Sequence, residues 1–208
     1  MAAADTFTIT IEGKGGHAAM PHLAVDTVLV AANVITALQG IVSRNADPLK
    51  SAVISVCTVQ SGSAYNIIPQ TATLLGTCRT LEEDVRDLCE RRIAEVAHGV
   101  AAAYGAKAEV VYERGYPVTV NHPEQTDFIA GVAAEIVGSD KVATDIAPLM
   151  GGEDFSYMLN ARPGAYIFLG NGDSQSCHHP AYVFDDEALP YGVSLWAKLV
   201  ERAMPAAA

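Results

Sequence analysis

The stretch FTITIEG, residues 7–13, alternates apolar and polar side chains and decides the class of fold. Phe7, Ile9 and Ile11 fall on one side of the alternation, while two threonines and a glutamate fall on the other. A period of two residues is typical of a β-strand that buries one face against a core. The sequence therefore predicts that the chain enters a sheet almost at its first residues.

The residues that follow continue this strand with two helices and three more strands. Apolar side chains recur at helical spacing over residues 26–44 and again over 80–104, where Thr80 and Glu83 form the pattern of a capping box. Strand-like runs follow at residues 51–60, 71–80 and 106–117. The order β-α-β-β-α-β over residues 6–116 predicts a ferredoxin-like domain, with a four-stranded sheet and two helices on one face. We therefore expect a chain of the mixed α/β (α+β) class.

Residues 117–208 have a different pattern. A helix is expected over residues 123–137 and another at the C-terminal end, to about Met204. Between them lie a glycine-rich turn and one short strand-like run, AYIFLG at residues 165–170. A lone strand has no partner for its backbone hydrogen bonds, so this part is predicted to be one portion of a larger α/β domain.

The composition limits the partners of the chain. Its net charge of −11, from 24 acidic and 13 basic residues, disfavours binding to nucleic acid, which depends on lysine and arginine. No apolar run approaches the roughly 20 residues of a membrane-spanning helix, and the start lacks the pattern of a signal peptide. The four cysteines include no CxxC pair and are expected to be reduced. We expect a cytoplasmic chain without a nucleic-acid or membrane partner.

Three candidate residues lie in the first part of the chain, and each alone has an ordinary structural interpretation. His17 follows a strand and two glycines in a loop, where a histidine is commonly only solvated. Asn66 can complete an Asx turn. Arg79 can be a solvated charge at the end of a strand, although its guanidinium suits a substrate carboxylate. The three residues indicate a functional site only when they are considered together.

The second part holds two further candidate motifs. Gly151-Gly152-Glu153-Asp154 fits a catalytic turn or a helix N-cap supplied by Asp154. His178 begins the loop motif HHP, but a single histidine cannot hold zinc or manganese, which need three or more protein ligands. No HExxH, GxSxG or phosphate-loop motif occurs, so zincin, serine-hydrolase and nucleotide-binding functions lack their necessary parts.

Taken in order, five motifs resemble the markers of the two-metal amidohydrolase, aminoacylase and carboxypeptidase family. They are GKGGHAAMPH (13–22), YNIIP (65–69), GTCRT (76–80), MGGEDFSYM (150–158) and HHPAYVFDDEALPYG (178–192). The branch that they resemble includes hippurate hydrolase, indole-acetyl-amino-acid hydrolase and N-acetyl-diaminopimelate deacetylase. The resemblance covers nearly the whole chain.

The resemblance implies an enzyme that hydrolyses the amide bond of N-acyl amino acids with two divalent metal ions, zinc or manganese. It also implies a catalytic domain that is split in sequence by a ferredoxin-like lid, through which the enzyme forms a homodimer. Residues 6–116 would be the lid and residues 117–208 the C-terminal part of the catalytic domain. The family's N-terminal catalytic half, with most metal ligands and the general base, has no counterpart in these motifs.

The resemblance also implies roles for single residues. His178 is expected to bind metal, and His17 to stabilise the oxyanion, usually in the partner subunit's site. Asn66 and Arg79 are expected to hold the substrate, with Arg79 on its carboxylate. The remaining expected site residues are the substrate-binding Gly151 and Gly152 and the catalytic Glu153.

With one metal ligand, the chain alone is expected to bind no metal tightly and to be inactive. Two alternatives stay open. The chain could be a non-catalytic dimerisation or assembly module, or a regulatory domain that binds a small molecule.

Overall fold

The structure is a computed structural model that describes residues 1–205, and it contains two compact units. The first unit comprises Met1–Thr119 and Pro148–Tyr157, and the second comprises Val120–Ala147 and the residues from Met158 onward. The chain is of the mixed α/β class, as expected, with an antiparallel sheet.

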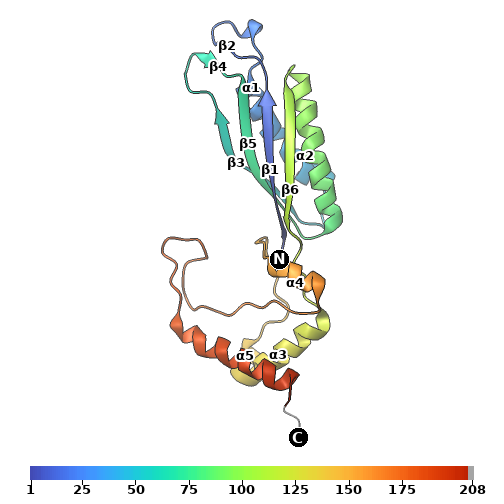
Figure 1. Ribbon diagram of the computed structural model, residues 1–208, viewed down its shortest axis with the longest axis vertical. Helices are drawn as coiled ribbons and strands as arrows, with labels where there is room; N and C mark the ends of the chain where they lie inside the picture. Colours follow the sequence, from blue (N-terminus) through green and yellow to red (C-terminus); the bar gives the residue numbers. More distant parts are fainter. Residues whose placement is uncertain (206–208) are drawn as a thin grey trace. The chain divides into compact units, whose positions relative to one another are not determined.

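Four long strands form the sheet of the first unit. They are β1 (Ala3–Glu12), β3 (Ala52–Ser61), β5 (Thr71–Thr80) and β6 (Lys107–Tyr116). Their order across the sheet is β3-β5-β1-β6, and every neighbouring pair is antiparallel (Figure 1). Two short strands, β2 (Gly16–His17) and β4 (Ile67–Ile68), pair with each other beyond the ends of the long strands.

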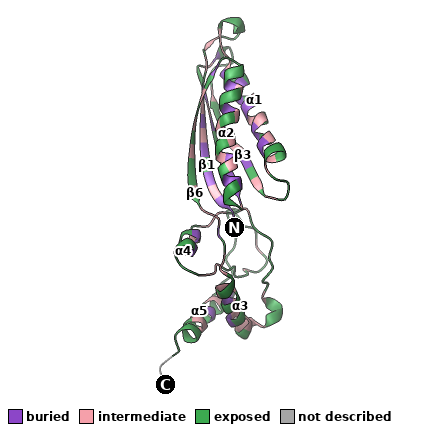
Figure 2. Cartoon of the chain, turned by 90° about the vertical axis from the view of Figure 1, so that its right-hand side faces the viewer, coloured by how far each residue is buried: buried purple, intermediate pink, exposed green. Residues whose placement is uncertain are grey.

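Two helices cover one face of this sheet, and the core lies between them and the strands (Figure 2). Helix α1 (Thr27–Gly40) begins at Asp26, whose carboxylate accepts the amides of Val28 and Leu29, and it continues into a π-helical turn, Ile41–Asn45. Helix α2 spans Glu83–Ala103. Phe7, Ile9 and Ile11, the apolar side of the opening alternation, are all buried in this core.

The helical stretch Thr27–Asn45 is long and apolar enough to cross a membrane by length and composition alone, which the sequence pattern did not suggest. It has 19 residues and a mean hydropathy of 1.4. Val30, Val34 and Leu38, spaced by one helical turn, are buried in the core of the first unit. The core helix of a soluble protein passes the same test, so this result is weak evidence for a membrane span.

The predicted capping box at Thr80 is wrong. Thr80 is the last residue of β5 and pairs with both Ala3 and Ala52, so the sheet continues where the helix was expected. Its Oγ1 is buried without a hydrogen-bond partner among the described residues. Helix α2 begins three residues later at Glu83, with two acidic residues in its first turn that favour a helix N-terminus.

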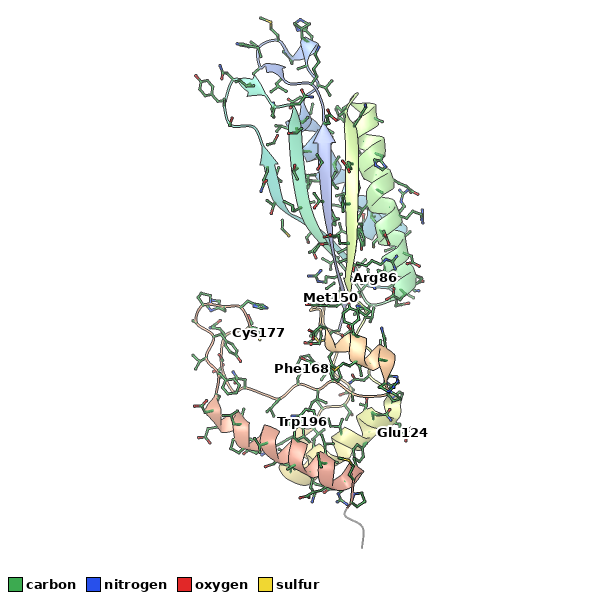
Figure 3. The ribbon with its side chains drawn as sticks, viewed as in Figure 1. Arg86, Glu124, Met150, Phe168, Cys177 and Trp196 are labelled. Carbon is green, nitrogen blue, oxygen red and sulfur yellow. The ribbon has the colours of Figure 1, made fainter. Side chains whose placement is uncertain are left out.

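A buried ion pair joins β1, α2 and β6 at the end of the sheet where β1 begins (Figure 3). The Arg86 guanidinium donates from Nε and Nη2 to the Asp5 carboxylate, over 2.9 and 2.6 Å. The Tyr112 hydroxyl and the Gly115 amide donate to the same carboxylate, over 2.7 and 3.0 Å. The Asp5 and Arg86 side chains are only 1% and 5% exposed, so their charges are neutralised by each other rather than by water.

Helices dominate the second unit. Helix α3 (Pro123–Val137) packs against α5 (Leu189–Ala203) through a small core of Ile129, Val132 and Leu195. The remaining helical segments of the chain are short: Pro21–Leu23, Ser139–Lys141, α4 (Phe155–Ala161) and Asp186–Ala188.

The strand predicted at residues 165–170 does not form. Instead, the side chain of Asn121 forms with the backbone of Tyr166 the two hydrogen bonds that a neighbouring strand would form. Its amide donates to the Tyr166 carbonyl and its oxygen accepts the Tyr166 amide, each over 2.8 Å. Phe168, in the same segment, is half exposed. A strand needs a partner along its length, and no described residue of this unit supplies one.

Asp5→Asn should lower the free energy of unfolding by about 3–5 kcal/mol, because it removes the buried counter-ion of Arg86 and leaves only the more exposed carboxylate of Glu83, 3.2 Å from Arg86 Nη1. Urea denaturation at neutral pH, with an unchanged slope, measures this loss. The matched control is Glu95→Gln, which breaks an exposed pair with Arg91 and Arg92 and should change the stability little. Equal effects of both changes would contradict a structural role for the buried pair.

The same pair predicts the direction of a pH dependence. Burial acts to raise the pKa of Asp5, but hydrogen bonds from Arg86, Tyr112 and Gly115 hold this pKa below its ordinary value. A folded-state pKa below the unfolded value of about 3.9 means that the stabilisation is complete above that pH and is lost as the pH falls through the folded pKa. The stability difference between the natural chain and Asp5→Asn should therefore be constant near neutral pH and shrink in acid.

Candidate functional site

His17 and Asn66 lie side by side at one end of the first unit. His17 in β2 pairs with Ile67 in β4, and the Ala18 amide donates to the Asn66 carbonyl over 3.0 Å. Both segments lie beyond the long strands, at the top of Figure 1. We call residues 14–24 and 62–70 the tip. The structure thus brings together two of the candidate residues that are far apart in the sequence.

The side chain of Gln70 holds the two segments of the tip together. Its Oε1 accepts the Gly15 amide over 2.9 Å, and its Nε2 donates to the Gly13 carbonyl over 2.7 Å. A β-carbon at Gly13 would lie 2.5 Å from the Val25 carbonyl oxygen, so only glycine fits where these two backbone segments approach each other. No sequence motif marks Gln70, because a glutamine after a loop proline is a common surface residue.

The ring of His17 is fixed in one tautomer by its own loop. The Ala19 amide donates to His17 Nδ1 over 3.1 Å. A neutral imidazole that accepts at Nδ1 carries its proton on Nε2. The residue is exposed, so His17 presents Nε2–H as a hydrogen-bond donor at the tip.

Arg79 lies at the opposite end of β5 from the tip, where it pairs with Ala4 and Val53. Its Nη1 donates to the Asp5 carbonyl, the Cys78 carbonyl and the Thr77 hydroxyl. No carboxylate forms an ion pair with Arg79 among residues 1–205, in contrast to Arg86. The fixed, partly buried guanidinium is therefore available to an anionic ligand.

Gly151 and Gly152 lie against the start of β1, with the first unit rather than with the later residues. The Ala2 amide donates to the Leu149 and Gly151 carbonyls, each over 3.0 Å. A β-carbon at Gly152 would lie 2.5 Å from the β-carbon of Ala4. Close packing thus explains Gly152 structurally, and the substrate-binding role expected for both glycines stays a prediction.

Glu153, not Asp154, supplies a side-chain cap at the start of α4. Glu153 Oε1 accepts the Phe155 amide over 3.3 Å, and its carbonyl accepts the buried Ser156 hydroxyl over 2.8 Å. The interpretation of Asp154 as the capping residue is therefore corrected, because the carboxylate one position earlier reaches the amide. The catalytic role expected for Glu153 stays a prediction.

His178 belongs to the second unit and has an unusual backbone. Its φ of 70° makes it the only non-glycine residue with positive φ within the described range. This conformation costs a residue with a β-carbon roughly 1 kcal/mol, and such strain is most often found at functional sites.

The two neighbouring histidines differ in what their rings can bind. The Ala181 amide donates to His179 Nδ1 over 3.1 Å, so neutral His179 carries its proton on Nε2 and has no free lone pair there. His178 has no such hydrogen bond among the described residues. The metal-binding role expected for His178 stays a prediction.

The described residues do not assemble a complete metal site. No group of three or more histidine, cysteine, aspartate or glutamate side chains among residues 1–205 is placed to hold a metal ion. All four cysteines are free: Cys78 and Cys89 are buried in the first unit, while Cys57 and Cys177 are exposed. His178 is thus a single donor where zinc or manganese requires at least three.

Comparison with known proteins gives consistent matches over nearly the whole chain. Peptidase family M20/M25/M40 matches residues 5–202. N-acetyl-L-cysteine deacetylase of Bacillus subtilis is 40% identical over 190 residues, which cover 91% of this chain and 45% of the relative. Hippurate hydrolase of Campylobacter jejuni is 38% identical over 199 residues, which cover 96% of this chain and 52% of the relative.

A solved structure agrees with these matches. The crystal structure of the YXEP protein of Bacillus subtilis, described as a dinuclear metal binding peptidase from the M20 family, superposes with a TM-score of 0.77 at 30% identity. The superposition covers 100% of this chain and 52% of that one. The chain spans about half the length of the relatives it matches.

Gly152→Ala should lower the free energy of unfolding by about 1–3 kcal/mol, because the new methyl group overlaps Ala4. Thermal or urea unfolding of the chain measures this change. Gly99→Ala in α2 is the matched control, since nothing lies within 4 Å of its β-carbon position. Replacing this helical glycine should raise the stability by about 0.5–1 kcal/mol. A stabilising Gly152→Ala would disprove the close packing.

Proposed function

The chain belongs to peptidase family M20/M25/M40, and we propose that it is part of a metal-dependent amidohydrolase that cleaves N-acyl amino acids. One observation of the geometry carries the proposal: His17 and Asn66 lie together at an exposed tip, with the imidazole fixed as an Nε2–H donor. Two relatives are named for the removal of an acyl group from an amino acid. Because the chain spans about half of their length, the activity would be that of the intact protein.

The first unit would be the lid of this enzyme. Strand order β3-β5-β1-β6, with α1 and α2 on one face, corresponds to the ferredoxin-like arrangement and supports this assignment. The tip carries two exposed polar side chains, His17 and Asn66, of the kind that contact a substrate.

The second unit would be the C-terminal part of the catalytic domain. Apolar side chains on α5 recur at intervals of one helical turn and are more than half exposed: Leu189, Val193, Trp196 and Val200 (Figure 3). A continuous exposed stripe of this kind is typical of a surface that another protein segment covers. We assign that segment to the other half of the catalytic domain, since the relatives are about twice as long as this chain.

His178 would be one ligand of a pair of divalent metal ions, zinc or manganese. The residues of this chain do not fit the pair by themselves, because His178 is a lone donor among the described side chains. The other ligands would come from the half of the catalytic domain that these residues do not include. The strained backbone of His178 supports a ligand role, because it directs one ring to a fixed position.

The remaining residues would act on the substrate directly. Negative charge develops on the carbonyl oxygen when a nucleophile attacks an amide, and a fixed donor such as His17 Nε2–H stabilises it. Asn66 would bind the substrate beside His17, and Arg79 would bind the free carboxylate of the amino acid through its planar guanidinium. This tautomer of His17 suits an oxyanion donor, because its proton lies on the ring nitrogen that the loop does not use.

The enzyme would act as a homodimer through the lid. The eight residue steps from Thr71 to Arg79 along β5 alone span about 26 Å, whereas N-acyl glycines from acetyl to hexanoyl measure only roughly 7–12 Å at full extension. One lid therefore cannot place both its tip and its Arg79 on the same substrate. Two copies can, and the edge strand β3 with its exposed Val53 and Val59 offers a surface for pairing them.

The intact protein, completed to the length of its relatives, should hydrolyse hippurate or an N-acetyl amino acid when zinc or manganese is supplied. The 208-residue chain alone should neither hydrolyse them nor bind either metal at micromolar affinity, because one imidazole leaves the ion mostly hydrated. Amine release and titration calorimetry measure the two properties. An intact protein that dimerises without turnover would favour the alternative of a non-catalytic assembly module.

Mixing two inactive variants of the intact protein tests the shared site. His17→Ala and Arg79→Ala should each abolish most activity, and a mixture that exchanges subunits should recover about a quarter of the natural activity. Half of the dimers are then mixed, and each mixed dimer has one site with an intact tip and an intact Arg79. The control mixture is His17→Ala with Asn66→Ala, in which no site has an intact tip. Recovery in neither mixture, or in both, would contradict the proposed dimer.

A further inference from the structure

We propose that four apolar side chains of the tip, Met20, Leu23, Tyr65 and Ile67, form the surface that recognises the acyl group of the substrate. This inference rests on the proposed function, and it assigns the selection of the acyl group to the tip. The carboxylate end of the same substrate would be selected by Arg79 of the other copy.

The four side chains are largely exposed. Tyr65 is fully exposed, Ile67 and Leu23 are each 57% exposed, and Met20 is 49% exposed. They come from both segments of the tip, on either side of the β2–β4 pairing. Gathered apolar exposure of this kind indicates a surface that becomes covered when a ligand or partner binds.

The backbone under these side chains is held in place. The Met20 amide donates to the His17 carbonyl over 2.8 Å, and the Leu23 amide donates to the Met20 carbonyl over 3.1 Å. On the other segment, the Pro69 carbonyl accepts the Thr27 hydroxyl over 3.0 Å. A surface with a fixed backbone can select among ligands by shape, because little order has to be gained on binding.

Chemical connectivity places the acyl group next to this surface. Ile67 lies directly opposite His17, and such cross-strand neighbours have β-carbons about 5 Å apart. If His17 donates to the carbonyl oxygen of the scissile amide, the acyl chain begins at the carbon that carries this oxygen. The amide nitrogen leads the other way, to the carboxylate and Arg79. The acyl chain is then the part of the substrate that can reach Ile67 and Tyr65.

The tip and Arg79 also match the two ends of the substrate in their chemistry. The acyl part of an N-acyl amino acid is apolar and uncharged, and the tip offers thioether, aliphatic and phenol side chains beside its polar pair. Arg79, about 26 Å away along β5, suits only the anionic end.

The experiment compares acyl groups on one amino acid. The intact protein and its Tyr65→Ala and Ile67→Ala variants are assayed with the acetyl, butanoyl, hexanoyl and benzoyl derivatives of glycine. We expect kcat/KM to fall about 10-fold or more for the benzoyl and hexanoyl substrates and about 2-fold or less for the acetyl substrate. Tyr65→Trp, which enlarges the surface, should shift the preference towards smaller acyl groups.

Leu49→Ala is the matched control. Leu49 is 93% exposed and lies in the loop before β3, at the Arg79 end of the same sheet. Its loss should change no acyl preference.

Two results would overturn the inference. An equal loss for all acyl groups in the tip variants, or no loss for any, would mean that the tip only packs against protein. An unaltered intact protein that hydrolyses none of the four substrates would overturn the proposed function itself, and the inference with it.

Discussion

The carboxylate of Asp5 holds together the end of the sheet on which Arg79 and the glycine turn depend. Arg86 and Tyr112 fix the side chain of Asp5 between α2 and β6, and this fixes the start of β1. The main chain of the same residue then serves the site, since the Asp5 carbonyl accepts the Arg79 guanidinium and the Thr77 hydroxyl. Packing of Gly152 against Ala4 uses the same anchored strand.

Arg86 and Arg79 both donate to Asp5, but they differ in whether a carboxylate neutralises their charge. Arg86 is enclosed and meets a carboxylate with two parallel hydrogen bonds, so its charge is fully used within the fold. Arg79 is held by carbonyl and hydroxyl oxygens only, which orient its guanidinium but leave its charge without a counter-ion among the described residues. Under the proposed function, the carboxylate of the substrate would be that counter-ion.

Sequence patterns predicted what depends on neighbouring residues and missed what depends on distant ones. The alternation of Phe7, Ile9 and Ile11 identified β1, because a strand that buries one face has an apolar side chain at every second residue. The run at residues 165–170 is equally apolar but forms no strand, because a strand also requires a partner. Thr80 matched a helix cap but ends a strand, since pairing with Ala3 and Ala52 outweighs a local motif. Only the resemblance linked His17 with Asn66, because their contact depends on the pairing of β2 with β4.

In the proposed dimer, the length of β5 would set the distance between the tip and Arg79. A strand that lost one residue would turn Arg79 from one face of the sheet to the other, because side chains alternate. Loss of two residues would restore the face but move the tip about 7 Å closer to Arg79. If the proposed dimer kept its geometry, the first unit could then no longer reach between its two sites. Insertions and deletions in this strand would therefore have to be matched by a change in the dimer interface, so the two features can evolve only together.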